Sequence, residues 1–250
     1  MKKILHITLF LFSIGVFACD CMPPNLTEKY SKSEFVAKVK IVRNYSNENS
    51  KELYKADIIV EELFKGKNIK SIIIAGRSDG KIGSSCSMFI PENTELIIYT
   101  SKNKNGNYVV GMCSGLLRFN DWNIKKQRKE LEILKALKSK DINFTNKISF
   151  RPESNIRNEL QQFKGIKLEK KYGIYEIKFE SDLTIKSVSK LIGFDNPIDL
   201  KLIEIIRQTK QSSFDKEIKN KVPENSRLLI GIYYYDREKS NSSFLSQYHL

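Results

Sequence analysis

Apolar and polar positions alternate along the first half of the chain. In FVAKVKIV, Phe35, Ala37 and Val39 share one face of an extended segment, while Lys38 and Lys40 lie on the other. A two-residue period with β-branched and aromatic side chains predicts strands. Similar runs, separated by turn-rich segments, follow at residues 54–64, 69–76, 94–100 and 107–113. Five short strands of this kind predict a small antiparallel barrel or sandwich.

A helical period follows the last of these strands. The segment IKKQRKELEILKALKSK predicts a basic helix over residues 124–139, with one apolar stripe formed by Ile124, Leu131, Leu134 and Leu137. We expect that stripe to pack on the strands and the basic face to lie in solvent. Its head, KKQRK at residues 125–129, is the densest basic cluster of a chain whose formal net charge is +14. Such an excess suits nucleic acid or an anionic membrane surface. No RNA-binding signature accompanies it, so we expect no nucleic-acid partner.

The second half predicts a different architecture. A strand at residues 172–182 and a returning strand at 183–193 form a hairpin, a helix covers 196–210, and a last strand covers 227–236. The helix has Asn196 as its N-cap, Pro197 at its first position and Asp199 at its third. The order β-β-α-β predicts a small two-layer α+β domain. Its helix should bury one stripe of side chains, namely Ile198, Leu202, Ile205, Ile206 and Thr209.

The N-terminal segment predicts export. Residues 1–18 read MKKILHITLFLFSIGVFA, with Lys2 and Lys3 before an apolar run that ends at Ala18. The run is too short to span a bilayer and has the pattern of a signal peptide. We divide the chain into a signal peptide at 1–18, a barrel domain with its helix at 19–145 and an α+β domain at 151–240. An alternative stays open, because the VFA box before Cys19 also suits an outer-membrane lipoprotein.

Four cysteines in an exported chain predict two disulfides. Cys19, Cys21, Cys86 and Cys113 all lie in the first half, which supports two separate domains. After the signal peptide, only His249 remains as an imidazole, and no GxSxG, HExxH or phosphate-binding glycine loop is present. Histidine-based catalysis and zinc hydrolase sites are therefore disfavoured. We expect no enzyme, no cofactor and no resident metal. A carboxylate-pair enzyme is not excluded by the pattern, but no pair stands out.

The order CDCMPP, EFVAKVKIV, VEELFKG, SSCSMF, ELIIYT and MCSG resembles the netrin-like domain family. It is most similar to the inhibitory domain of tissue inhibitors of metalloproteinases. That resemblance implies an OB-type five-stranded barrel with disulfides Cys19–Cys86 and Cys21–Cys113. It also implies that the amine and carbonyl of Cys19 bind the zinc of a partner metalloprotease. The implied protease-binding residues are Cys19, Asp20, Cys21, Met22, Pro23, Ser84 and Ser85.

The second domain resembles the C-terminal domain of TonB over residues 165–236. The resemblance rests on a glycine-led hairpin, an (L/I)D-type helix and a last strand after a proline-containing loop. It implies a cell-envelope domain, in a Gram-negative bacterium, whose edge strand pairs with an envelope protein. The run Tyr233–Tyr235 then marks an interface, or places one ring inward and two outward. The alternative to protease inhibition is thus a periplasmic or lipid-anchored interaction module with the barrel as scaffold. Membrane contact is expected only through a lipid on Cys19.

Overall fold

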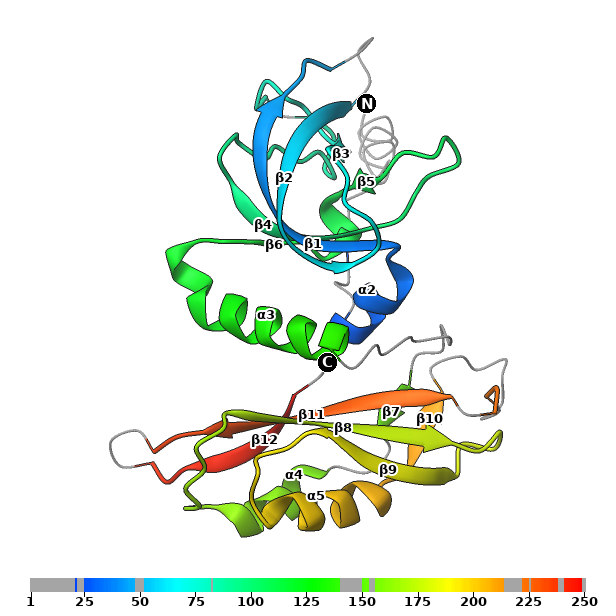
Figure 1. Ribbon diagram of the computed structural model, residues 1–250, viewed down its shortest axis with the longest axis vertical. Coiled ribbons are helices and arrows are strands. Elements are labelled where there is room, and N and C mark those ends of the chain that lie inside the picture. The colour runs from blue at the N-terminus through cyan, green and yellow to red at the C-terminus, as the bar shows by residue number, and fades with distance from the viewer. Residues whose placement is uncertain are drawn as a thin grey trace, which may run out of the picture.

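The structure stacks two sheets and two layers of helices (Figure 1). The computed structural model describes residues 21, 25–47, 52–81, 83–139, 150–152, 156–213, 222–224, 226–237 and 241–248. A curled first sheet lies at one end, helices α2 and α3 lie beneath it, and a second sheet with its own helices completes the stack. Two domains are therefore present, a barrel-like one and an α+β one, as the sequence predicts.

The first sheet has six strands in the order β5-β3-β2-β1-β4-β6. Their bounds are β1 Phe35–Asn44, β2 Leu53–Lys65, β3 Ser71–Ala75, β4 Glu95–Thr100, β5 Val109–Val110 and β6 Leu117–Arg118. The five predicted strands are all found, and the two-residue β6 is an addition at the β4 edge. The shared face predicted for Phe35, Ala37 and Val39 of β1 is confirmed, because all three are fully buried in the core of the curled sheet.

The sheet curls because the chain passes from β4, near one edge of the sheet, directly to β5, at the opposite edge. Strand β5 pairs in parallel with β3, with Ile73 opposite Val109. A hairpin links the same strand to β4, through a bridge between Lys102 and Tyr108. The Thr100 hydroxyl also donates a hydrogen bond to the Val109 carbonyl over 2.6 Å. These contacts give a half-barrel in which β5 lies against both β3 and β4.

The second domain contains more than the predicted β-β-α-β order. Its sheet runs β12-β11-β8-β9, and α5 packs on one face. The elements are α4 Ile156–Leu160, η3 Gln161–Phe163, β8 Tyr172–Phe179, β9 Ile185–Ile192, α5 Ile198–Arg207, β11 Arg227–Tyr235 and β12 Phe244–Tyr248, beside a two-stranded sheet of β7 Phe150–Pro152 and β10 Gln211–Ser213. The predicted stripe on α5 is buried throughout. Asn196 lies one residue earlier than a true N-cap, although its side chain accepts a hydrogen bond from the Ile198 amide.

Strand β12 changes the expected edge of this sheet. It pairs with β11 and extends the sheet beyond residue 240. The tyrosine run on β11 is therefore internal to the sheet. Tyr234 is buried on the α5 side and Tyr235 is 41% exposed, while Tyr233 approaches α3. One ring points inward, as one of the two readings of the sequence predicts, but Tyr233 meets another part of the same chain.

Helix α3, Ile124–Ser139, lies between the two domains (Figure 1). A single apolar cluster contains Leu134 and Leu137 of α3, Ile97 of the barrel, and Ile174 and Leu229 of the second sheet. The second sheet is thus covered on both faces, by α5 on one side and by α3 on the other. This shared cluster joins the two domains.

The predicted stripe on α3 is only partly right. Leu134 and Leu137 are fully buried, but Ile124 is 42% exposed. The buried face instead includes Glu130, at 3% exposure, and Ile133. The prediction was incomplete because it considered only apolar residues, whereas this face of the helix also buries the Glu130 carboxylate.

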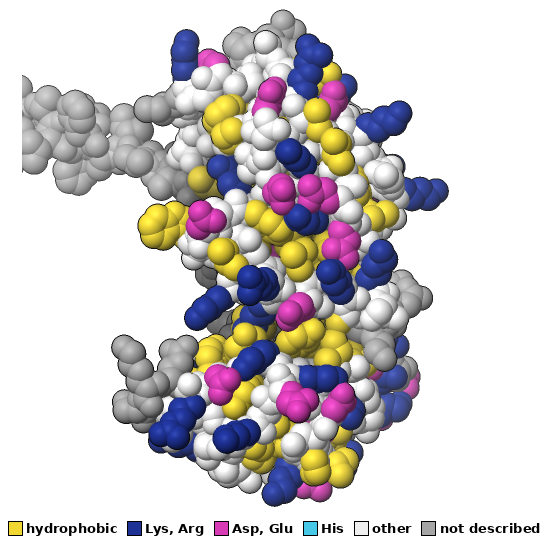
Figure 2. Space-filling view, turned by 60° about the vertical axis from the view of Figure 1, so that its left-hand side comes forward, with side chains coloured by type: hydrophobic (Ala, Val, Ile, Leu, Met, Phe, Trp, Pro, Cys, Tyr) yellow, Lys and Arg dark blue, Asp and Glu magenta, His cyan; other side chains and the backbone are white. Residues whose placement is uncertain are grey.

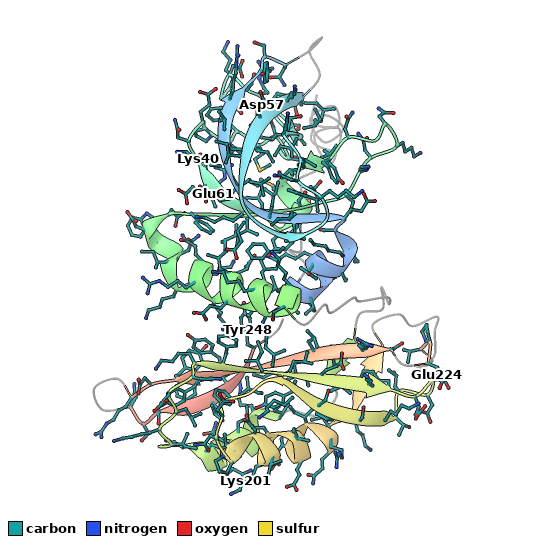
Figure 3. The ribbon with its side chains drawn as sticks, viewed as in Figure 1. Lys40, Asp57, Glu61, Lys201, Glu224 and Tyr248 are labelled. Atoms are coloured by element: carbon teal, nitrogen blue, oxygen red, sulfur yellow. A yellow bond between two sulfur atoms is a disulfide. The ribbon has the colours of Figure 1, made fainter. Side chains whose placement is uncertain are left out.

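Lys129 connects α3 to the second sheet. Its ammonium lies 3.2 Å from the ring centroid of Tyr248 and 3.9 Å from that of Tyr233. Figure 3 shows Tyr248 between the sheet and α3. Burial lowers the pKa of Lys129 to about 8, so the side chain is still mostly charged at pH 7. A cation held against two aromatic faces is stabilising, by about 0.5–2 kcal/mol.

We expect Lys129→Glu to weaken the junction between the domains. The carboxylate would replace attraction to two rings with repulsion in a half-buried site, at a cost of about 1–3 kcal/mol. Urea unfolding measures this loss, and Lys125→Glu on the exposed side of the same helix is the matched control. If the two variants unfold at the same urea concentration, the aromatic contacts of Lys129 do not stabilise the junction.

Candidate functional site

The candidate site lies where the N-terminal segment meets the end of β5. Cys21 is bonded to Cys113, with their Cα atoms 5.3 Å apart, which confirms one of the two implied disulfides. Cys113 lies in η1, Met112–Ser114, directly after β5. Cys19, Asp20, Met22 and Pro23 lie outside the described residues, so their proposed roles and the Cys19–Cys86 bridge stay predictions. None of the described cysteines, Cys86 included, is a free thiol.

Helix α2, Leu26–Lys32, holds the segment that follows Cys21. No helix is predicted here from the periodicity of the sequence. Asn25 starts the helix, because its side chain accepts a hydrogen bond from the Glu28 amide over 2.8 Å. Leu26 and Tyr30 then join the apolar cluster that contains Leu117. The pattern Asn-x-x-Glu at residues 25–28 is a capping signal that reveals this helix in the sequence.

A buried charged network fixes α2 to the rest of the domain. The Lys29 ammonium donates to a Glu130 carboxylate oxygen over 2.6 Å and to the Gly115 carbonyl over 3.1 Å. The Tyr99 hydroxyl donates to the same carboxylate oxygen over 2.6 Å. Lys29 and Glu130 are 9% and 3% exposed. This network therefore links α2, α3, β4 and the turn after Cys113 at one point.

The network shifts the pKa values of two of its members. Burial lowers the pKa of Lys29, although the adjacent Glu130 opposes that shift. Burial and the neighbouring Glu130 carboxylate raise the pKa of Tyr99 well above its usual value. The phenol therefore stays protonated at neutral pH and donates its hydrogen bond to Glu130.

Ser84 and Ser85 lie in an exposed turn between β3 and β4, next to Cys86. Glu52, directly before β2, holds this turn: it accepts a hydrogen bond from the Ser84 amide over 2.7 Å and another from the Ser84 hydroxyl. These hydrogen bonds lower the pKa of Glu52. Sequence reasoning missed Glu52 because nothing in the local pattern indicates a partner 32 positions away.

The loop that carries Ser84 is also fixed at its base. Gly76 has a φ of +156°, and a Cβ there would lie 1.9 Å from the Met88 carbonyl oxygen, so no larger residue fits. The Asn47 side chain donates to the Gly76 carbonyl over 2.8 Å and accepts from the Ser78 amide over 2.9 Å. The β1–β2 and β3–β4 loops are thereby held together on one end of the barrel.

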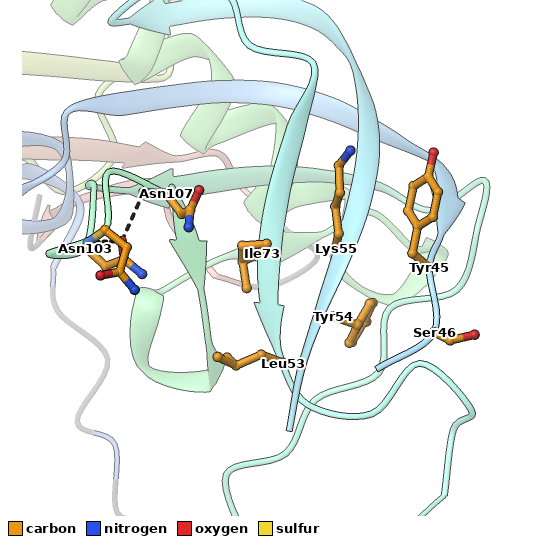
Figure 4. A pocket seen from close by; sticks show the side chains of 9 residues that line it. Tyr45, Ser46, Leu53, Tyr54, Lys55, Ile73, Asn103 and Asn107 are labelled. Carbon is orange, nitrogen blue, oxygen red and sulfur yellow. Dashed lines mark hydrogen bonds between the residues drawn. The ribbon is translucent and has the colours of Figure 1, made fainter. Parts of the chain in front are cut away.

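A separate surface pocket of about 440 Å³ lies over β2 and β3 (Figure 4). Its walls come from the β1–β2 loop and the β4–β5 hairpin, and none of the implied protease-binding residues lines it. Its lining is Tyr45, Ser46, Leu53, Tyr54, Lys55, Ile73, Asn103, Asn105 and Asn107. We assign no role to it.

Within the described ranges, no group of three or more His, Cys, Asp or Glu side chains is placed to hold a metal ion. Among those same residues, no helix has the length and apolar character to cross a bilayer.

The curled sheet, the stapled N-terminal segment and the helix packed beneath them define a netrin-like domain. The family model of tissue inhibitor of metalloproteinase matches residues 17–135, which include the whole first sheet, α2 and most of α3. The N-terminal domain is thus a TIMP-like domain. A comparison with curated proteins finds no significant match to the chain. The resemblance of the second domain to TonB stays a prediction.

Proposed function

We propose that this protein is a secreted or periplasmic inhibitor of a zinc metalloendopeptidase and acts through its N-terminal residue. The observation that carries the proposal is the Cys21–Cys113 disulfide in a domain matched by the metalloproteinase-inhibitor family. That bridge fixes the chain two residues after the expected mature N-terminus at Cys19. Family members inhibit proteases and are not enzymes, so the partner proposed here is a metalloproteinase.

The chemistry of the proposed contact is simple. A terminal α-amine has a pKa near 8, so a substantial fraction is neutral at physiological pH and can donate its lone pair to zinc. The carbonyl of Cys19 would complete a chelate on the protease metal. Because the disulfide and α2 already restrain the segment, little conformational entropy is lost on binding. Ser84, which Glu52 holds, and its neighbour Ser85 would contact the protease beside this ligand.

Asp20 limits which proteases this end of the chain can bind, because its side chain must suit the pocket beside the zinc. On this proposal its carboxylate enters the pocket next to the zinc. Burying an unpaired carboxylate in an apolar pocket costs several kcal/mol. We therefore propose a target whose pocket offers a cation or hydrogen-bond donors.

An added alanine before Cys19 tests the mechanism. The extension moves the amine away from the zinc, so we expect inhibition of a responsive zinc endopeptidase to fall at least about 100-fold, the loss of a metal chelate worth about 2.7 kcal/mol or more. Both proteins are produced with residues 1–18, and intact-mass measurement before the assay must show a free amine at Cys19 in the parent and at the added alanine in the variant. An alanine added after Leu250 is the control. Unchanged inhibition by the extended protein, or a diacylglyceryl adduct on Cys19, contradicts the mechanism.

A further inference from the structure

Trp122 is an unusual residue on this surface. It is the single tryptophan of the chain, and its side chain is 96% exposed. It lies in η2, Asp121–Asn123, the short turn that leads into α3. Ile124, the first residue of the helix, is 42% exposed beside it in the sequence. Tryptophan is usually well buried in a folded protein, so an exposed tryptophan suggests a surface that becomes buried when a partner binds.

Three basic residues follow Trp122 within six positions of the sequence. Lys125, Lys126 and Arg128 are exposed, and in the described part of the chain none of them forms an ion pair. On the same helix, by contrast, Lys135 pairs with Glu62 at 3.6 Å. Asp121 is the one acidic residue between positions 119 and 129. The start of α3 therefore carries positive charge that no carboxylate of the described residues pairs with.

These basic residues do not stabilise α3. The first turn of α3 has no acidic residue. The helix dipole places partial positive charge at this end, where a cation costs about 0.3–1 kcal/mol. Lys125 and Lys126 thus lower the stability of α3 slightly, and an external anionic partner would account for their presence.

Two of these side chains also lie on the exposed face of α3, where a partner can reach them. Ile124 and Arg128 are one helical turn apart and lie away from the face that buries Glu130, Ile133 and Leu134. Figure 2 shows Lys and Arg side chains at the level between the two domains, where Figure 1 places α3, with hydrophobic side chains next to them and a few Asp and Glu side chains among them. We call the exposed set Trp122, Ile124, Lys125, Lys126 and Arg128 the Trp122 patch.

We propose that the Trp122 patch docks the protein on the surface of an anionic phospholipid bilayer. Tryptophan is favoured at the boundary between headgroups and acyl chains, and basic residues near an anionic membrane contribute about 1 kcal/mol each. A protruding aromatic side chain with cations around it suits shallow insertion better than a fit against a flat protein partner. This contact needs no lipid on Cys19, so it revises the expectation that membrane binding depends on lipidation.

The single tryptophan provides the test. The chain is produced from residue 19 onward, so no acyl group is attached, and is mixed with vesicles of phosphatidylglycerol and phosphatidylcholine or of phosphatidylcholine alone. We expect the Trp122 emission to shift to shorter wavelength and to resist acrylamide quenching only with the anionic vesicles. Co-sedimentation gives the affinity, which 0.5 M salt should reduce strongly, because exposed charges are screened at that concentration.

Two matched charge variants locate the surface. The variant K125E/K126E/R128E should bind anionic vesicles at least about tenfold more weakly, given about 1 kcal/mol for each cation. The variant K164E/K201E/R207E changes net charge equally, at exposed positions of the second domain; Figure 3 places Lys201 on α5, on the far side of the second sheet from α3. It should bind almost as well as the parent. Circular dichroism checks that both variants fold. Equal loss in both variants, no shift of the Trp122 emission, or binding to heparin without binding to vesicles overturns the proposal.

Discussion

Glu130→Ala is expected to be the most destabilising single substitution considered for this protein, with a loss of about 3–5 kcal/mol. The Lys29 ammonium would stay buried without a counter-charge, keeping the Gly115 carbonyl and the face of the Tyr99 ring as partners, and the Tyr99 hydroxyl would lose its acceptor. Breaking a buried ion pair from one side is costly because the remaining charge is left without compensation. Urea unfolding followed by circular dichroism measures the change.

Two further variants separate the buried charge from the helix itself. Glu132→Ala removes an exposed carboxylate of the same helix, and its effect should stay within about 0.5 kcal/mol. The pair Lys29→Met with Glu130→Leu removes both charges and should recover most of the stability, because a buried ion pair is often replaceable by apolar side chains. If Glu130→Ala unfolds like Glu132→Ala, the network does not hold α2 to α3.

Replacing both Cys21 and Cys113 by serine is expected to have the second large effect. The bridge spans 92 positions, and the chain-entropy model values a loop of that size at roughly 4–5 kcal/mol. Changing both residues together avoids a free thiol. We also expect weaker inhibition on the proposed mechanism, because the proposed zinc ligand lies two residues from the lost bridge and would have to be ordered on binding.

Met112→Ser is the matched control for the loss of that bridge. Met112 lies next to Cys113 and is 48% exposed, so its replacement should change stability little. Denaturant unfolding and inhibition are measured on both variants. A double serine variant that keeps its stability to within about 1 kcal/mol would mean that the network around Glu130 alone holds the N-terminal segment.

The long elements were predictable from the sequence because their periodicity is strong. Strands β1 and β2 are ten and thirteen residues long and alternate over much of their length, and α5 keeps its apolar stripe through nearly three turns. The short elements were missed for the opposite reason. Strands β6 and β12 have two and five residues, which is too short for a clear alternation, even though β12 pairs with β11, the strand directly before it in the chain.

The candidate site was predictable only where a family resemblance supplied long-range information. Periodicity does not pair Cys21 with Cys113, and the resemblance did. The resemblance in turn said nothing of Glu130, which lies on α3 at the junction with the second domain. A charged residue in a helix is assigned to solvent by pattern alone. Its burial depends on Lys29, which lies 101 positions away.

The position of α3 constrains how this molecule can change over evolutionary time. One cluster holds Leu134 with Ile97 on one side and Ile174 on the other, so the helix is part of both cores. Gene recombination that exchanged the second half for an unrelated module would leave the far side of α3 without its covering sheet. The two halves are therefore expected to be inherited together.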